Sequence, residues 1–220
     1  MIAPEIISDI TTALQIDESG EHALIQMHEH NMSQLPVLDG NKYIGLVTME
    51  DVINMKHLSK PLKNFGDKFR KPFVLHTAHI FDVMKAALDF NVRVVPVVDE
   101  QKQYLGLVSA ESCLRAFATL NSVKSPGAII EMQIAQPEFS LTEIARLAAE
   151  NDVAILAFYS GLDAQTGIMN ITLKLNTTDV ASLMATFERF SYDIKEVHNE
   201  VAYSEDLKDR YDALMRYLNV

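Results

Sequence analysis

The sequence predicts a mixed α/β (α+β) protein in which two related units are followed by a third unit of different topology. Two short apolar runs around a polar turn occur at residues 35–52 and again at residues 95–114. After Gly127 the pattern changes, and four strand-like runs alternate with two amphipathic helices in the order βαββαβ. With 220 residues, 48% of them hydrophobic, the chain is long enough to bury more than one core.

The first two units are an internal repeat. Pro36 aligns with Pro96 at an offset of 60 residues, and after the turn Gly45 aligns with Gly106 at an offset of 61. A one-residue difference in turn length accounts for the change of offset. Apolar residues spaced three to five apart precede each first strand, so each copy predicts helix, strand, turn, strand and helix. We assign the copies to residues 1–60 and 61–120.

A hydroxyl and a carboxylate, those of Thr48 and Asp51, follow the second strand of the first copy at a spacing of three. One interpretation is that they only cap the following helix. The other is a ligand site, because a strand-to-helix junction presents backbone amides that favour a phosphate, and a carboxylate accepts both hydroxyl donors of a ribose. Spacing alone leaves both interpretations open.

The pattern Gly-x-x-Thr/Ser-x-x-Asp, preceded by a Pro-Val-x-Asp strand and an amphipathic helix, resembles the CBS (cystathionine beta-synthase) domain over roughly residues 5–120. The resemblance implies a tandem pair that binds an adenine nucleotide (AMP, ADP, ATP or an adenosine derivative) between the repeats and regulates another protein. The nucleotide-binding residues it implies are Thr12, Leu14, Gln34, Leu35, Pro36, Gly45, Thr48 and Asp51, with Arg93 as a phosphate partner.

The second repeat departs from this pattern. Pro96, Gly106 and Ser109 match, but Ser112 stands where the aspartate is expected, so a degenerate second site is predicted. The resemblance also implies a homodimer with two-fold symmetry. The apolar helix positions expected in its interface are Val52, Ile53, Leu114 and Phe117.

The net charge of the chain limits the classes of molecule that it is expected to bind. The net charge of −11 argues against nucleic-acid binding, which requires a cationic surface. One segment, residues 56–71, is basic, with four lysines besides Arg70 and Lys71 and a single acid, Asp67, among them. The positively charged residues of this segment are Lys56, Lys60, Lys63, Lys68, Arg70 and Lys71. It is interpreted either as a solvated linker or as a segment that attracts a small anion such as a phosphate.

Residues 127–203 predict the ferredoxin-like βαββαβ arrangement and resemble an ACT domain. Strands are expected at residues 128–135, 153–159, 168–175 and 192–201, with a turn at residues 161–167. Glu138 stands where the amino-acid-binding members have a glycine, which favours a pairing module over an amino-acid sensor. Two CBS repeats followed by an ACT-like domain resemble the acetoin-utilisation regulatory (AcuB) family. Residues 204–220 predict a C-terminal amphipathic helix.

Other chemistry is not predicted. No catalytic motif is recognised, so we expect no enzyme and no required cofactor. On a helix, His28 and His30 would point to different faces, and His76 and His79 lack a clear third ligand, so no metal site is expected. Cys113 is interpreted as a buried inert thiol, and with no apolar run of membrane-spanning length a cytoplasmic protein without membrane association is expected. The leading hypothesis is a non-catalytic nucleotide sensor; the alternatives are a dimeric interaction scaffold with vestigial nucleotide sites and an amino-acid sensor.

Overall fold

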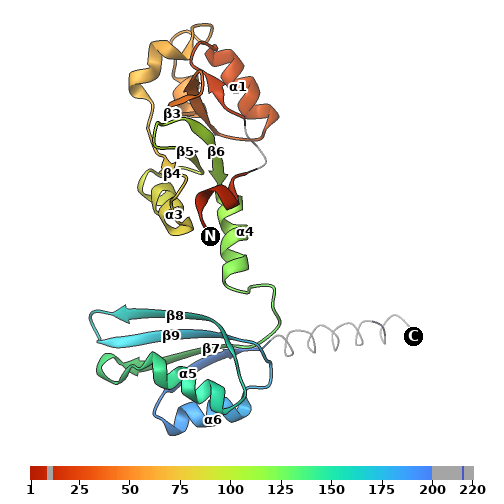
Figure 1. The fold of residues 1–220 in the computed structure, drawn as a ribbon, viewed down its shortest axis with the longest axis vertical. Coiled ribbons are helices and arrows are strands. Elements are labelled where there is room, and N and C mark those ends of the chain that lie inside the picture. Colours follow the sequence, from red (N-terminus) through yellow and green to blue (C-terminus); the bar gives the residue numbers. More distant parts are fainter. Residues whose placement is uncertain (9–11, 200–214, 216–220) are drawn as a thin grey trace. The chain divides into compact units, whose positions relative to one another are not determined.

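The computed structural model describes residues 1–8, 12–199 and 215. The chain forms two compact units, Met1–Phe117 (the N-terminal unit) and Ala118–Val220 (the C-terminal unit), both drawn in Figure 1. Of the predicted C-terminal helix at residues 204–220, all but Met215 lies outside the described residues. Among the helices that the structure describes, none is long and apolar enough to cross a bilayer.

The N-terminal unit contains two copies of one arrangement, as the internal repeat predicted. The first copy comprises β1 (Leu14–Gln15), α1 (Gly20–Glu29), β2 (Gln34–Asp39), β3 (Lys42–Thr48) and α2 (Met49–Ile53). The second comprises β4 (Val74–Leu75), α3 (Ile80–Asp89), β5 (Val94–Val98), β6 (Tyr104–Ser109) and α4 (Ala110–Leu120). The 3-10 helices η1 (Ala3–Ile6) and η2 (Leu62–Lys68) precede the two copies.

Each copy builds a three-stranded sheet, in the orders β1-β2-β3 and β4-β5-β6. The two long strands form the predicted antiparallel hairpin, and the short first strand joins β2 or β5 in parallel. The short strands β1 and β4 were not predicted, because two residues are too few to show an alternating pattern.

The segment that precedes each copy pairs with the sheet of the other copy. The backbone N–H of Ser8 donates to the carbonyl of Leu107, and that of Leu46 donates to the carbonyl of Arg70, both at 2.8 Å. These two bonds occupy equivalent positions in the repeat, so the unit has an approximate internal two-fold symmetry. The exchange of segments means that neither copy completes its sheet edge alone.

One predicted interface position is wrong. Val52 is fully buried in the core of the first copy, together with Leu35, Val37 and Val47, so it contributes nothing to an outer surface. Helix α2 has only five residues, and Val52 is the one that faces inward. The other apolar helix positions differ in exposure, Ile53 being 61% and Leu114 68% exposed, and Phe117 half-buried.

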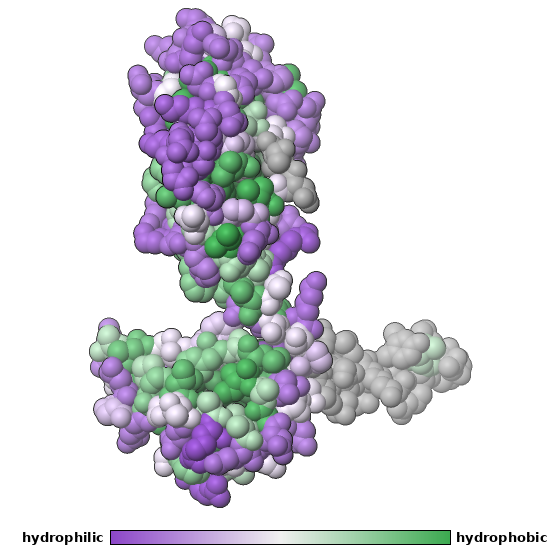
Figure 2. Space-filling model, in the orientation of Figure 1, coloured by the Kyte–Doolittle hydropathy of each residue, from purple (hydrophilic) through white to green (hydrophobic). Residues whose placement is uncertain are grey.

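Apolar side chains also reach the surface of both units. Phe81, Leu88 and Leu114 on helices α3 and α4 are more than half exposed. Figure 2 shows apolar residues gathered over part of the visible surface of each unit. Cys113 in α4 is instead buried, and burial raises the pKa of its thiol, as expected for an unreactive cysteine.

The C-terminal unit has the predicted ferredoxin-like topology. Its elements are β7 (Ile129–Ala135), η3 (Gln136–Glu138), α5 (Leu141–Glu150), β8 (Ile155–Asp163), β9 (Ile168–Leu175), α6 (Ala181–Arg189) and β10 (Asp193–His198). The sheet is antiparallel with the order β10-β7-β9-β8. Helices α5 and α6 cover one face (Figure 1) and bury the core, which includes Ile130, Met132, Ile144, Leu173 and Phe187.

The end of β8 differs from the prediction. We expected a turn at residues 161–167, but β8 continues to Asp163 and Gly161 pairs with Asn170 inside the hairpin. Gly167, with φ of 70°, provides the left-handed position that the tight turn needs. Cross-strand pairing with β9 therefore outweighs the turn preference of Gly161.

Candidate functional site

Thr48 and Asp51 form a reciprocal cap at the start of α2. The backbone N–H and the Oγ1 hydroxyl of Thr48 both donate to Oδ2 of Asp51, at 3.0 and 2.6 Å. The backbone N–H of Asp51 donates in return to Oγ1 of Thr48 at 3.0 Å. The two residues therefore form a capping box, in which both bonds to the carboxylate use Oδ2 and neither uses Oδ1.

A cavity of about 720 Å³ lies between the two repeats beside this cap. Thr48, Asp51 and Gln34 contribute from the first repeat, while Arg70 and Asn91 contribute from the second-repeat side. It is lined by Ser33, Gln34, Thr48, Met49, Glu50, Asp51, Ile53, Asn54, Arg70 and Asn91. Its volume is in the range of small-molecule sites, and its lining is mostly polar.

Arg70 is held at this cavity by a hydrogen bond within the second repeat. Its Nη1 donates to the carbonyl of Phe90 at 3.0 Å. A guanidinium has five N–H donors, so donors beyond this bond can serve an anion. The sequence analysis named Arg70 only as part of the basic segment and did not name Asn91. Tertiary packing brings both to the cavity of Asp51, and Arg70 is brought there by the pairing of its segment with Leu46.

A second cavity of about 320 Å³ occupies the equivalent position beside Ser109. Ser109 Oγ donates to Ser112 Oγ at 3.1 Å and accepts from the Ser112 backbone N–H at 3.1 Å, so no carboxylate stands at the position of Asp51. Arg93 lines this second cavity rather than the first, and its backbone N–H donates to Gln34 Oε1 at 2.9 Å.

The remaining predicted site residues lie in other surroundings. Leu14, Leu35, Pro36 and Gly45 are buried in the first repeat, and Pro96 and Gly106 are buried in the second. Thr12 is half-buried, with its Oγ1 3.0 Å from Nε2 of His30, a residue of the second cavity. The structure thus brings together Gln34, Thr48 and Asp51 of the predicted set.

Gly45 and Gly106 have a role that follows from the exchanged segments. A Cβ at Gly45 would lie 2.7 Å from Cβ of Phe69, and one at Gly106 would lie 2.7 Å from Cγ2 of Ile7. Both glycines are therefore needed where the segment from the other repeat crosses the strand. Nothing in this packing requires a bound ligand.

A third cavity, of about 480 Å³, adjoins the first at Asp51. Much of its wall comes from the basic segment predicted from the sequence. The cavity is lined by Asp51, Asn54, Met55, Lys56, His57, Lys60, Asn64, Phe65, Lys68 and Phe69. Lys63 of the same segment points elsewhere and pairs with Asp17 at 2.7 Å. Positive charge is thus concentrated beside the Asp51 carboxylate.

His76 and His79 of the second repeat do not converge on a common site; each contacts a different part of the protein. His79 caps α3, where its Nδ1 accepts from the Phe81 backbone N–H at 3.3 Å. His76 lies with Nδ1 3.7 Å from Glu100. His79 therefore has a hydrogen-bond partner of its own, whereas Nδ1 of His76 lies beyond hydrogen-bonding distance of Glu100.

Residues 5–57 and 69–119 match the family model of the CBS domain, so the N-terminal unit contains a tandem CBS domain pair. A curated relative, an inosine-5'-monophosphate dehydrogenase from Korarchaeum cryptofilum, is 32% identical over 107 residues, which are 48% of this chain. Those residues are 22% of the relative, so the chain spans less than a quarter of that enzyme's length.

Two solved structures are also similar. One is a CBS domain pair/ACT domain protein from Thermotoga maritima, with 22% identity and a TM-score of 0.49 over 54% of this chain and 98% of that one. The other is CBSX2 in complex with AMP, with 20% identity and a TM-score of 0.47 over 54% of this chain and 96% of that one.

Proposed function

We propose that the CBS pair binds one adenine nucleotide in the cavity beside Asp51, and that binding regulates another protein. CBS pairs are typically regulatory rather than catalytic, and they often bind adenine nucleotides. The observation that carries the proposal is how the two oxygens of the Asp51 carboxylate are used. Its cap contacts occupy Oδ2, while Oδ1 stays available at a polar cavity between the repeats.

The number of available lone pairs fits a ribose. A carboxylate oxygen accepts up to two hydrogen bonds, and Oδ2 of Asp51 already accepts two from Thr48. Oδ1 therefore accepts the two hydroxyl donors of a ribose diol without disturbing the cap. Arg70, held by Phe90 in the same cavity, is placed to pair with a phosphate. The second cavity lacks the carboxylate, so we assign one nucleotide to each chain.

We further propose that the C-terminal unit acts as an ACT-like pairing module in a homodimer. Its ferredoxin-like topology supports this role, and the exposed acid Glu138 at η3 disfavours an amino-acid carboxylate there. Ile53 and Leu114 are exposed and suited to an interface of the N-terminal units. The domain order resembles that of the acetoin-utilisation regulatory protein AcuB; the regulated partner is left open.

The test is calorimetric titration of AMP, ADP and ATP into the parent chain, Asp51→Asn and Asp82→Asn. Asp82 is the matched control, because its Oδ2 accepts from the His79 backbone N–H at 3.0 Å in a second capping box outside the Asp51 cavity. Asp51→Asn should weaken binding about 10- to 100-fold, since a charge-assisted hydrogen bond contributes about 1.5–3 kcal/mol. Asp82→Asn should bind like the parent.

Two results contradict the proposal. One is a parent chain that binds none of the three nucleotides, which leaves the interaction scaffold as the better hypothesis. The other is an Asp51→Asn variant that binds as tightly as the parent, which places the nucleotide elsewhere. A loss of affinity in both variants would show that capping, and not the cavity, controls binding.

A further inference from the structure

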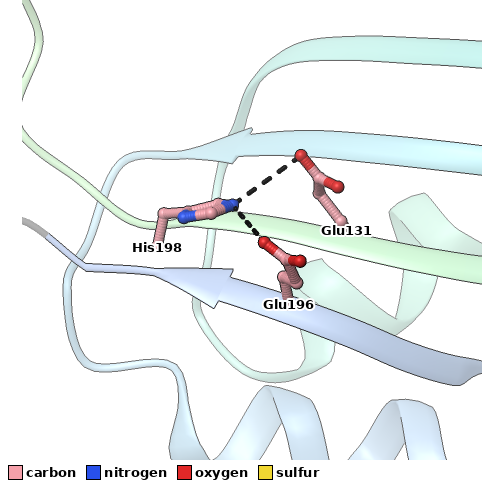
Figure 3. Close-up of side chains that lie close together, drawn as sticks. All are labelled: Glu131, Glu196 and His198. Atoms are coloured by element: carbon pink, nitrogen blue, oxygen red, sulfur yellow. Dashed lines mark ion pairs between the residues drawn. The ribbon is translucent and has the colours of Figure 1, made fainter.

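Three side chains of the types that bind metal ions meet on the C-terminal sheet, outside the nucleotide cavity. Glu131 lies on β7, and Glu196 and His198 lie on the neighbouring strand β10, with the three side chains converging as Figure 3 shows. Glu131 alternates along β7 with the core residues Ile130 and Met132, so the group is on the face opposite the helices.

The distances suit coordination of one ion. His198 Nε2 lies 3.2 Å from Glu196 Oε2 and 3.7 Å from Glu131 Oε1. All three ligand atoms lie within 4.8 Å of one another. Two ligands bound to zinc at about 2.1 Å with a tetrahedral angle are separated by about 3.4 Å. An ion therefore fits between the imidazole and both carboxylates with only small side-chain adjustments.

The strand register gives an independent reason to expect a cation. Ile194 pairs with Met132, so an unbroken register would place Lys195 opposite Glu131, a favourable pair of opposite charges. A register shift between Ile194 and Glu196 instead places Glu196 opposite Glu131. Like charges directly opposite on neighbouring strands are destabilising, and bulges commonly re-aim a side chain for a purpose.

The alternative cation in this position is a proton on His198. An imidazolium would pair with both glutamates without any metal, and the side chains are 47–64% exposed, so such pairs contribute little to stability. The same exposure leaves room for water ligands to complete the coordination of a metal ion. The two interpretations differ in one measurable respect, which is whether a divalent ion stabilises the chain through His198.

We propose that Glu131, Glu196 and His198 form a binding site for a divalent transition-metal ion of the zinc type. One imidazole and two carboxylates are ligands that zinc and its neighbours in the first row accept, whereas magnesium prefers oxygen ligands alone. The site is independent of the proposed nucleotide function. It joins β7 to β10, so an ion would cross-link the edge strand of the sheet to its neighbour.

The experiment is calorimetric titration of Zn²⁺ into the metal-free full chain, with thermal unfolding measured in parallel. The parent should bind one ion that raises the unfolding temperature, since a ligand that binds the folded state stabilises it. His198→Ala should weaken this binding at least tenfold and remove the thermal shift. The matched control is His28→Ala, which removes an exposed histidine on α1 and should leave both readouts unchanged.

A second variant, Glu131→Gln, keeps the proposal testable if His198→Ala folds poorly. It removes one of the two opposing carboxylates, so it should unfold at the parent's temperature or above without metal and lose the Zn²⁺ shift. The proposal is overturned if the parent binds no Zn²⁺, or if His198→Ala and Glu131→Gln retain the parent's affinity. Zn²⁺ binding that is lost in His28→Ala instead would assign the ion to another site.

Discussion

Asp51 accepts both hydrogen bonds from Thr48 on the same carboxylate oxygen, which lets a single side chain cap a helix and keep its second oxygen for other partners. The second repeat provides an informative comparison, because His79 and Asp82 form a capping box of the same type at α3. A capping box is therefore no evidence for a site by itself. What distinguishes Asp51 is the cavity between the repeats and the arginine that the other repeat places there.

The first prediction concerns the close crossing at Gly45. Gly45→Ala should lower the free energy of unfolding by about 1–3 kcal/mol, the usual cost of overpacking. The new Cβ would lie 2.7 Å from Cβ of Phe69 and 2.9 Å from the carbonyl oxygen of Arg70, and a backbone atom cannot rotate away. Urea unfolding followed by circular dichroism measures the change. Nucleotide affinity should fall as well, because the crossing positions Arg70.

Gly66→Ala is the control for this prediction. A Cβ at Gly66 would meet no atom within 4 Å, and the residue belongs to the same inter-repeat segment as Phe69. An alanine there should be neutral or slightly stabilising, because it reduces the conformational freedom of the unfolded chain. Equal stability losses in both variants would contradict the prediction, because only the alanine at Gly45 meets the crossing segment.

Much of this fold was accessible from the sequence because it rests on local signals. The repeat offset located both hairpins, and a hydroxyl with an acid three residues later located the start of α2 at Thr48. The third unit was recognised from the order of its periodic segments, and the structure has that order. Such patterns depend on neighbours in sequence, which the sequence displays directly.

The features that could not be predicted depend on tertiary pairing. Arg70 reaches the cavity of Asp51 only because its segment pairs with Leu46 in the other repeat. Val52 is buried because it is the residue of the short helix α2 that faces the core of the first repeat, while its neighbour Ile53 faces outward. The group around His198 depends on a register shift in β10, and no residue spacing in the sequence signals such a shift.

A second prediction restores the missing carboxylate of the second repeat. Ser112→Asp should raise the nucleotide stoichiometry from one to two per chain in a calorimetric titration. Ser112 already contacts the hydroxyl of Ser109 as Asp51 contacts Thr48, so the side chain starts from an equivalent position. The cavity of about 320 Å³ beside Ser109 provides the space, and Arg93 lines it.

Ser112→Asn separates charge from shape in this experiment. It has nearly the same size as aspartate but cannot accept two hydroxyl donors on a charged oxygen. The stoichiometry should stay at one for the asparagine variant. An unchanged stoichiometry for Ser112→Asp as well would mean that the second cavity lacks more than a carboxylate.

The third prediction concerns alkaline stability of the C-terminal unit. Tyr192 is 2% exposed and its hydroxyl donates to Glu143 Oε2 at 3.1 Å. Burial, followed by this bond and the negative charge of Glu143, raises the pKa of Tyr192 from 10.0 to about 12. The folded state therefore holds the proton more tightly than the unfolded state. The stability from this linkage is fully present below pH 10 and is lost as the pH rises towards 12.

Tyr192→Phe removes both the titrating hydroxyl and its bond, so the variant should be less stable than the parent at pH 8 and closer to it at pH 11. The measurement is the urea midpoint of unfolding at several pH values between 8 and 11, with Tyr159→Phe as the control. Tyr159 lies on β8 of the same unit and is 40% exposed, so its variant should follow the parent across the range. A gap between parent and Tyr192→Phe that stays constant with pH would contradict the linkage, because only a group that titrates differently in the folded and unfolded states makes stability depend on pH.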